Sequence, residues 1–308
     1  MQSDGRSTSG QSAHAEKLEM PIAVERNTSG MGFSFPRVYL DNRFVYLLLS
    51  ARAGGMTIGV DLEPDKECNP SCTQCDIHRV GRLLEPRLDV QGMADELTRT
   101  LALFRGGRVR ELPNYRLVPD QLLHLRHVSL VGESEPTLAA DCFEAFEAVI
   151  HIRALSGFGF FKLVLMTNGA GLDQPGAQQR SLRHLTRMDE IWLRLDGGTQ
   201  TYINKANHSG ASLEKVLANI LLLGRQRPVI IQSLFPAIHG EGPSIEEIEQ
   251  YGQRLLELKN AGAQISHVQV YSATCPAAFP PFSHLSLKAL SLIAKSVRQI
   301  SGLKTEIS

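Results

Sequence analysis

Cysteine is scarce in this sequence of 308 residues, and the chain has no excess of either charge. Its five cysteines are an odd number with three in one short segment, a distribution that does not indicate a disulfide framework. Thirty-two basic and thirty-two acidic residues cancel, so the bulk charge favours neither nucleic acid nor an anionic membrane surface. We expect a protein of the reducing cytoplasm.

Long apolar runs are also missing. No run approaches the ~20 residues that a transmembrane helix requires. The run from Phe44 to Leu49 is short and lies between Arg43 and Arg52. The first residues lack the apolar core of a secretory signal peptide. The sequence therefore predicts a protein that does not enter a membrane.

Hydrophobic residues make up 43% of the chain, which is enough for a sizeable core. The length is normal for a single α/β barrel. Residues 1–35 are rich in serine, glycine and charge and are predicted to form a mobile N-terminal tail. Residues 36–56 are predicted as an N-terminal strand or cap, and residues 57–308 as one barrel domain.

Strand and helix patterns alternate along the predicted barrel domain. After a longer first gap the strand-like runs recur every ~28–39 residues, near the ~30 of one strand–helix unit in an α/β barrel. Amphipathic stripes between the runs predict helices, and Ser244 with Glu247 forms the pattern of a capping box. The six predicted strands are Thr57–Leu62, His127–Val131, Lys162–Thr167, Glu190–Leu195, Val229–Leu234 and His267–Tyr271.

Three cysteines, Cys68, Cys72 and Cys75, follow the first predicted strand. Their spacing would form one stripe on a helix. Pro70 argues against a helix, because an interior proline removes a hydrogen bond and clashes with the preceding turn. The polar residues between the cysteines prefer turns. We therefore predict a loop that can direct three sulfur atoms toward one metal centre.

Two metal centres are compatible with three clustered thiolates. A four-iron cluster held by three cysteines keeps one iron open, whereas a structural zinc site needs a fourth ligand, which His78 could supply. Cys142 and Cys275 stand alone and far away in the sequence. The zinc alternative predicts a metal-stabilised binding module without catalysis.

The pattern C-x-x-x-C-x-x-C of Cys68, Cys72 and Cys75 resembles the signature of the radical S-adenosylmethionine (radical SAM) superfamily. The resemblance implies an α/β fold, a partial (βα)6 barrel with an N-terminal extension. It also implies a [4Fe-4S] cluster whose open iron binds S-adenosylmethionine. An electron from a flavodoxin- or ferredoxin-type donor then produces a 5′-deoxyadenosyl radical, which abstracts hydrogen from a substrate that the sequence does not identify.

The same resemblance assigns roles to two residues near the cluster. The segment Gly132-Glu133-Ser134-Glu135 precedes Pro-Thr-Leu and aligns with the Gly-Gly-Glu motif of relatives. This alignment implies that Glu135 binds the amino group of the cofactor's methionine moiety. An ordinary polar loop is the alternative. Gln74 stands where many relatives have an aromatic residue close to the adenine.

Further site residues follow the third and fourth predicted strands. Asn168, in a Thr-Asn-Gly sequence that relatives often share, could reach the cofactor or could simply form a turn. Asp196 is expected to bind the ribose hydroxyls or, alternatively, to cap a helix. Alternation places Leu193 and Leu195 on the helix-covered outside, and Arg194 with Asp196 inside, where Arg194 could engage the cofactor's carboxylate.

Other features leave the substrate open. Gln232, within the fifth predicted strand, and His239, in the segment after it, are active-site candidates of unknown role. Cys275, after the sixth predicted strand, is either a thiol at the barrel mouth or a small buried residue. Within the superfamily the chain is most similar in pattern to the iron–sulfur oxidoreductase group that includes tRNA-wyosine synthases. This similarity implies tRNA modification as an alternative, for which the neutral composition shows no basic surface.

Overall fold

The computed structural model describes most of the predicted barrel domain. The described residues are 42–50, 53–62, 88–131, 136–138, 141–158, 161–169, 184–206, 212–272 and 282–307. The predicted tail, the cysteine segment, Gln74, Glu135 and Cys275 lie outside these ranges. No helix in the described part of the chain is long and apolar enough to cross a membrane.

One large sheet organises the described residues, with eight strands in the spatial order β1-β2-β3-β4-β5-β6-β8-β10. The run from β2 to β8 is parallel, β10 is parallel to β8, and β1 is antiparallel to β2. The strands are β1 (Val45–Ser50), β2 (Gly55–Asp61), β3 (Leu125–Val131), β4 (Lys162–Thr167), β5 (Glu190–Arg194), β6 (Val229–Leu234), β8 (Ile265–Tyr271) and β10 (Thr305–Ile307).

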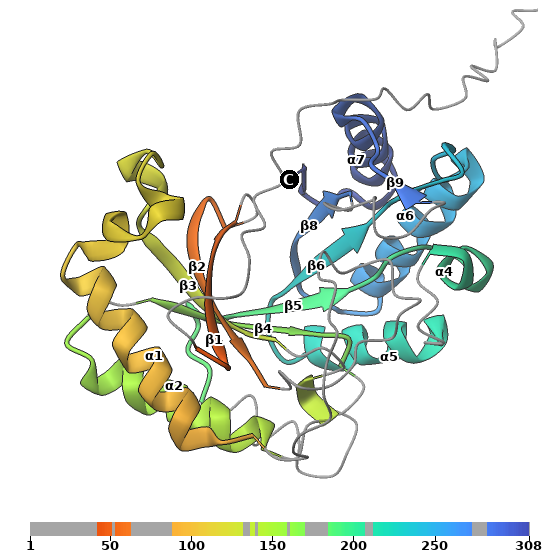
Figure 1. The fold of residues 1–308 in the computed structure, drawn as a ribbon. Helices are drawn as coiled ribbons and strands as arrows, with labels where there is room; N and C mark the ends of the chain where they lie inside the picture. The colour runs from red at the N-terminus through yellow and green to blue at the C-terminus, as the bar shows by residue number, and fades with distance from the viewer. Residues whose placement is uncertain are drawn as a thin grey trace, which may run out of the picture.

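The six parallel strands β2, β3, β4, β5, β6 and β8 are the six predicted from the sequence, with ends shifted by at most two residues. Figure 1 shows the sheet curling into a half-barrel with the helices on its outside. The expected α/β fold, a partial barrel, is therefore confirmed.

Helices connect most of the strands, and polar side chains fix where several of them begin. Asp89, Ser212, Ser244 and Ser286 each accept a hydrogen bond from a backbone N–H of the first turn, which satisfies a group that has no partner within the helix. The helices are α1 (Val90–Arg105), α2 (Cys142–Leu155), α4 (Gln200–Ala206), α5 (Leu213–Gly224), α6 (Ile245–Asn260) and α7 (Leu287–Ser301).

Shorter elements complete the described chain. A two-stranded ladder pairs β7 (Ala237–Ile238) with β9 (Phe282–Ser283). Single turns of 3-10 helix, which the sequence analysis did not predict, lie mostly between α1 and β3. They are η1 (Arg108–Glu111), η2 (Pro113–Tyr115), η3 (Asp120–Leu122) and η4 (Pro136–Leu138).

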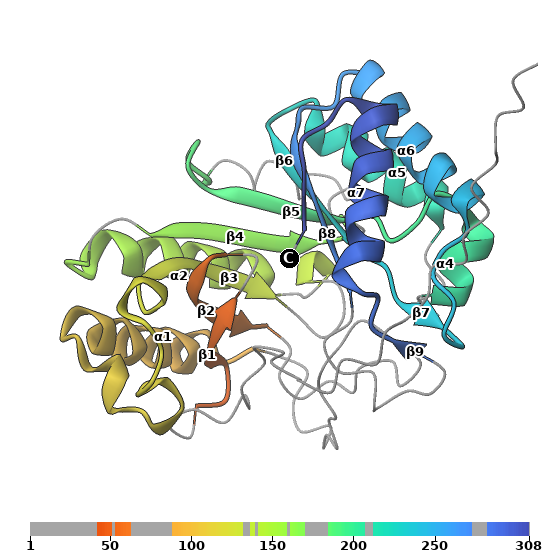
Figure 2. The ribbon, with the colours of Figure 1, turned by 90° about the horizontal axis from the view of Figure 1, so that it is seen from above.

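Two apolar cores lie between the sheet and its helices. One joins α1 and α2 to the outer face of β1 to β4, through residues such as Leu97, Phe146 and Ile58. The other joins the later helices to β5, β6 and β8, through residues such as Leu193 and Ile293. Figure 2 shows these two groups of helices over different parts of the curled sheet.

The inner face of the sheet is mostly polar. A small apolar cluster of Val164, Trp192 and Ile230, with Met166 packed against it, lies at mid-height. Around it, alternation brings polar side chains such as Thr57 and His127, whose side chains are 3.1 Å apart, to the same concave surface. This surface is where a partial barrel can hold ligands.

Candidate active site

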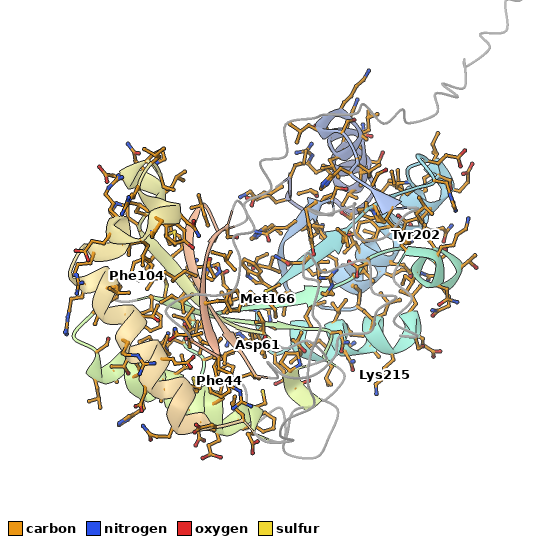
Figure 3. All side chains as sticks on the ribbon, viewed as in Figure 1. Phe44, Asp61, Phe104, Met166, Tyr202 and Lys215 are labelled. Carbon is orange, nitrogen blue, oxygen red and sulfur yellow. The ribbon has the colours of Figure 1, made fainter. Side chains whose placement is uncertain are left out.

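The carboxyl ends of the parallel strands form one rim of the half-barrel. In α/β barrels the reactive groups gather at this rim. β2 ends at Asp61 and β5 leads into Asp196, while Asn168 follows β4 directly. Figure 3 shows Asp61 and Met166 near the middle of the molecule. The described part of the rim is thus lined by polar side chains from several strands.

Asp196 is the best-defined side chain of this rim. It is 6% exposed and forms an ion pair with Arg194, with Nη2 to Oδ1 at 3.1 Å. Leu193 and Leu195 are buried in the core beneath the later helices, as the alternation predicted. Arg194 lies opposite Gln232 of β6 in the register, on the inner side. The charged pair therefore stands where a polar ligand in the barrel mouth could contact it.

Asp196 does not cap the helix α4 that follows it, because the Thr199 hydroxyl accepts from the first-turn N–H of Tyr202 at 3.2 Å. Glu247 of α6 accepts hydrogen bonds from the backbone N–H groups of Gly198 and Thr199 and from the Thr199 hydroxyl, ahead of α4. Burial raises the pKa of Glu247, and these hydrogen bonds partly offset that rise. The predicted capping box is therefore half wrong: Ser244 caps α6, but the Glu247 side chain does not return to it.

The absence of a side chain at Gly198 allows α6 to come close enough for Glu247 to accept these hydrogen bonds. A Cβ at this position would lie 2.1 Å from the backbone nitrogen of Tyr251, so no other residue fits without moving α6. Nearby Tyr202 lies among the later helices, on the right in Figure 3. Its buried hydroxyl has no hydrogen-bond partner among the residues that the structure describes, and burial together with Glu247 and Asp196 raises its pKa. Tyr202 therefore stays neutral and belongs to the wall behind the rim.

Asn168 lies in a turn at the end of β4. The backbone N–H of Gly169 donates to the Thr167 hydroxyl at 2.8 Å, and Gly169 has a φ of 79°, which favours glycine. Asn219 of α5 donates to the carbonyl of Asn168 at 3.4 Å. Asn168 is half-buried and follows β4 directly at the rim, and its role toward a cofactor stays a prediction.

The other candidate residues divide into buried and exposed. Gln232 is fully buried on the inner face and donates to Gln269 of β8 at 2.6 Å. His239 is exposed in a tight turn after β7, with a φ of 53°. Cys142 is a buried residue at the start of α2.

Asp61 received no role from the sequence, although the structure places it at the rim. It is 2% exposed and ends β2, immediately before the segment that leads to the cysteines. Its neighbours Ile58 and Val60 belong to the outer core, so alternation puts Asp61 on the inner face. The sequence does contain a signal for this residue: Asp61 is an acid at an inward-facing position of a strand that is otherwise apolar near its end.

The described residues do not include a metal site of their own. Within them, no three side chains of histidine, cysteine, aspartate or glutamate gather in a way that could hold a metal ion. The predicted ligands Cys68, Cys72 and Cys75 lie outside the described ranges, as do His78 and Glu135. The assignments of Cys68, Cys72, Cys75, Gln74 and Glu135 remain predictions.

Comparison with known proteins gives structural likeness without sequence likeness. No protein-family model matches the sequence, and no curated protein matches it. A radical SAM methyltransferase from Sphaerobacter thermophilus has a TM-score of 0.59 at 14% identity, over 86% of this chain and 68% of that one.

Two TYW1 structures are also similar. TYW1 with a lysine-pyruvate adduct bound has a TM-score of 0.49 at 16% identity, over 82% of this chain and 75% of that one. Archaeal TYW1 has a TM-score of 0.43 at 17% identity, over 82% and 74%. At such identities the likeness to the methyltransferase shows that the two chains share a fold.

Proposed function

We propose that this chain, which has the partial-barrel fold of radical SAM enzymes, is itself an enzyme of that superfamily. The structural likeness to the methyltransferase supports the class and leaves the reaction open. The proposed activity is reductive cleavage of S-adenosylmethionine at a [4Fe-4S] cluster. The resulting 5′-deoxyadenosyl radical abstracts hydrogen from the enzyme's own substrate.

One observation carries the proposal. The segment with Cys68, Cys72 and Cys75 begins directly after the carboxyl end of β2, between Asp61 and the start of α1 at Val90. Reactive groups of α/β barrels stand at this end of the strands. A structural zinc site could lie anywhere on a protein surface, so the zinc alternative does not account for the position of the three cysteines at this rim.

The rim residues have the chemistry that the cofactor needs. Cys68, Cys72 and Cys75 would hold the cluster, which supplies the electron for sulfonium cleavage. Glu135 would accept from the methionine amino group, and Arg194 would bind the methionine carboxylate. The buried carboxylate of Asp196 would accept from the ribose hydroxyls, and a carboxylate–hydroxyl hydrogen bond is stronger than a neutral one.

Asn168 and Gln74 complete the proposed cofactor site. Asn168, half-buried in the turn after β4, offers an amide with both donors and an acceptor. Gln74, one residue before the third cysteine, would lie beside the adenine without the stacking that an aromatic ring provides. The adenine would then be held mainly by hydrogen bonds.

The test is formation of 5′-deoxyadenosine. The full-length chain would be reconstituted anaerobically with iron and sulfide, reduced, and given S-adenosylmethionine. We expect 5′-deoxyadenosine and methionine in the products, detected by mass spectrometry. The Cys72→Ala variant, treated identically, should form neither.

Metal analysis separates this proposal from the zinc alternative. Iron with sulfide in the purified protein is expected, together with charge-transfer absorption in the visible range. One zinc ion per chain, with no 5′-deoxyadenosine after reconstitution, would overturn the proposal in favour of a binding module.

A further inference from the structure

A cavity opens at the end of the half-barrel opposite the candidate active site. Its volume is about 440 Å³, within the range typical of small-molecule sites. Its wall comes from the amino-terminal ends of the parallel strands, among them Leu125 of β3, Lys162 of β4 and Glu190 of β5. Because the proposed cofactor site lies at the carboxyl ends, this cavity is a separate feature.

The carboxylates in the cavity wall already have cationic partners. Glu190 pairs with Lys162 at 2.6 Å and also accepts from the indole nitrogen of Trp192 at 2.9 Å. Glu306 of β10 pairs with Lys304 at 2.6 Å. The wall's negative charge is therefore neutralised within the protein.

Arg126 of β3 is the cation that remains. Its Nε donates to the carbonyl of Gly54 at 3.1 Å, which holds the side chain at the rim of the cavity. Among the described residues its guanidinium has no carboxylate partner, so its two terminal nitrogens keep their donors. Such a fork binds a carboxylate with two parallel hydrogen bonds.

The remaining wall combines apolar side chains with the polar groups of His127, His267 and Gln269. Leu125, Met188, Trp192 and Ile230 supply the apolar surface. His267 faces Gln269, whose amide nitrogen is 3.3 Å from its Nε2. Burial lowers the pKa of His267, so its ring is neutral near pH 7 and adds no second cation to the wall.

We propose that this cavity binds a small organic anion, a carboxylate with an apolar or aromatic body. Arg126 holds the carboxylate, with spare donors of Lys162 beside it, and the body lies against Leu125, Met188 and Trp192. A net anion is favoured because, among the described residues of the wall, Arg126 is the charged group without a charged partner. An apolar body is favoured because the side chains of Met188, 57% exposed, and of partly exposed Leu125 would be removed from water on binding.

The chain provides its own reporter for the test. Trp192 is its single tryptophan and lines the cavity, so its fluorescence responds to occupancy. Phenylacetate would be titrated into the full-length chain, with binding measured by calorimetry and located by Trp192 fluorescence. Phenylacetamide, which has the same body without the charge, and inorganic phosphate, which has charge without the body, serve as comparison ligands.

Two variants separate the site from general charge effects. Arg126→Gln should weaken phenylacetate binding by about tenfold to hundredfold, the usual loss for a charge-assisted contact. Arg99→Gln, at an exposed position of α1, should leave binding unchanged. Phenylacetamide and phosphate should bind at least about tenfold more weakly than phenylacetate. Both variants should melt like the parent chain because both arginines are exposed.

Three results would overturn the proposal. The first is the absence of saturable phenylacetate binding up to about 10 mM, an affinity too weak for a built site. The second is unchanged affinity in Arg126→Gln. The third is phosphate binding as tightly as phenylacetate, which would leave no role for the apolar wall. None of these results depends on 5′-deoxyadenosine formation.

Discussion

The Asp196 carboxylate accepts a hydrogen bond of 2.9 Å from the backbone N–H of Leu234. This bond joins the carboxyl ends of β5 and β6, and the same carboxylate pairs with Arg194. A carboxylate fixed by a neighbouring strand needs little reorganisation when a ligand arrives, so binding loses less side-chain entropy. Asp196 is thus both a support of the rim and a candidate ligand-binding group.

Asp196→Asn should separate these two roles. The amide oxygen of asparagine can still accept from Leu234, so the fold and the iron content should be retained. The lost charge should weaken S-adenosylmethionine binding by about tenfold to hundredfold, the equivalent of about 1.5–3 kcal/mol. Calorimetric titration of the reconstituted protein measures it. Unfolding, or an unchanged dissociation constant, would contradict the prediction.

Glu247→Gln should have the opposite profile. The carboxylate holds Gly198 and Thr199 ahead of α4 with three hydrogen bonds, one of them from a hydroxyl. Its loss should lower the free energy of unfolding by about 1–3 kcal/mol, while cofactor affinity stays within about twofold. Urea denaturation measures the first and calorimetry the second. Glu249→Gln, at an exposed position of the same helix, is the matched control.

The faces of β5 could be predicted because a strand has a strict period of two residues. Leu193 and Leu195 were assigned to the outer core and Arg194 to the inside, and the structure agrees. The role of Glu247 could not be predicted, because it depends on contacts with residues almost fifty positions away. The local capping pattern of Ser244 and Glu247 gives no information on the backbone of Gly198 and Thr199 as partners of the Glu247 carboxylate. Tertiary packing decided which donors the carboxylate met.

The sequence concentrates its most specific signal in one short segment, Cys68-x-x-x-Cys72-x-x-Cys75, and the metal assignment of these cysteines stays a prediction. The cavity around Trp192 was not predictable. Lys162 and Glu190 become partners only through the register of neighbouring strands, which the sequence does not specify. Strand β10 is only three residues long, too short for a periodic signal.

The cluster assignment predicts a clear division among the five cysteines. Alanine at Cys68, Cys72 or Cys75 should abolish the visible absorption and the cluster iron, because each removes one of three thiolate ligands. Cys142→Ala and Cys275→Ala should retain both. Iron analysis and absorption spectra after anaerobic reconstitution measure this. Cluster loss in either of the last two variants would show that the ligand set is wrong.

The proposed register of the loop after β3 predicts that Glu135, and not Glu133, binds the methionine amino group. The Pro-Thr-Leu continuation fixes this alignment with the family motif. Glu135→Gln should weaken S-adenosylmethionine binding by about tenfold to hundredfold, while Glu133→Gln should change it little. Cofactor titration compares the two, and damage confined to Glu133→Gln would reverse the register.

Asp189, which precedes β5, should make the stability of the protein depend on acid. Its side chain is fully buried and pairs with Arg153 at 2.6 Å. It also accepts from the backbone N–H groups of Leu163 and Thr186, both at 2.8 Å. Burial alone would raise the pKa of Asp189. The hydrogen bonds and the Arg153 charge outweigh burial and hold the pKa below its ordinary value of 3.8.

A carboxyl group with a lowered pKa in the folded state stabilises the protein above its unfolded pKa, and this stability is lost as pH falls through the folded pKa. Asp189→Asn should therefore lower the free energy of unfolding near pH 7 by about 3–5 kcal/mol, because the neutral amide no longer pairs with the buried charge of Arg153. The difference from the parent chain should shrink as pH falls below about 4, where Asp189 of the unfolded parent chain takes up a proton while the folded carboxylate stays charged. Urea denaturation across this pH range measures it, with Asp95→Asn on the exposed face of α1 as the control. A difference that stays constant with pH would show that the carboxylate charge does not provide the stability.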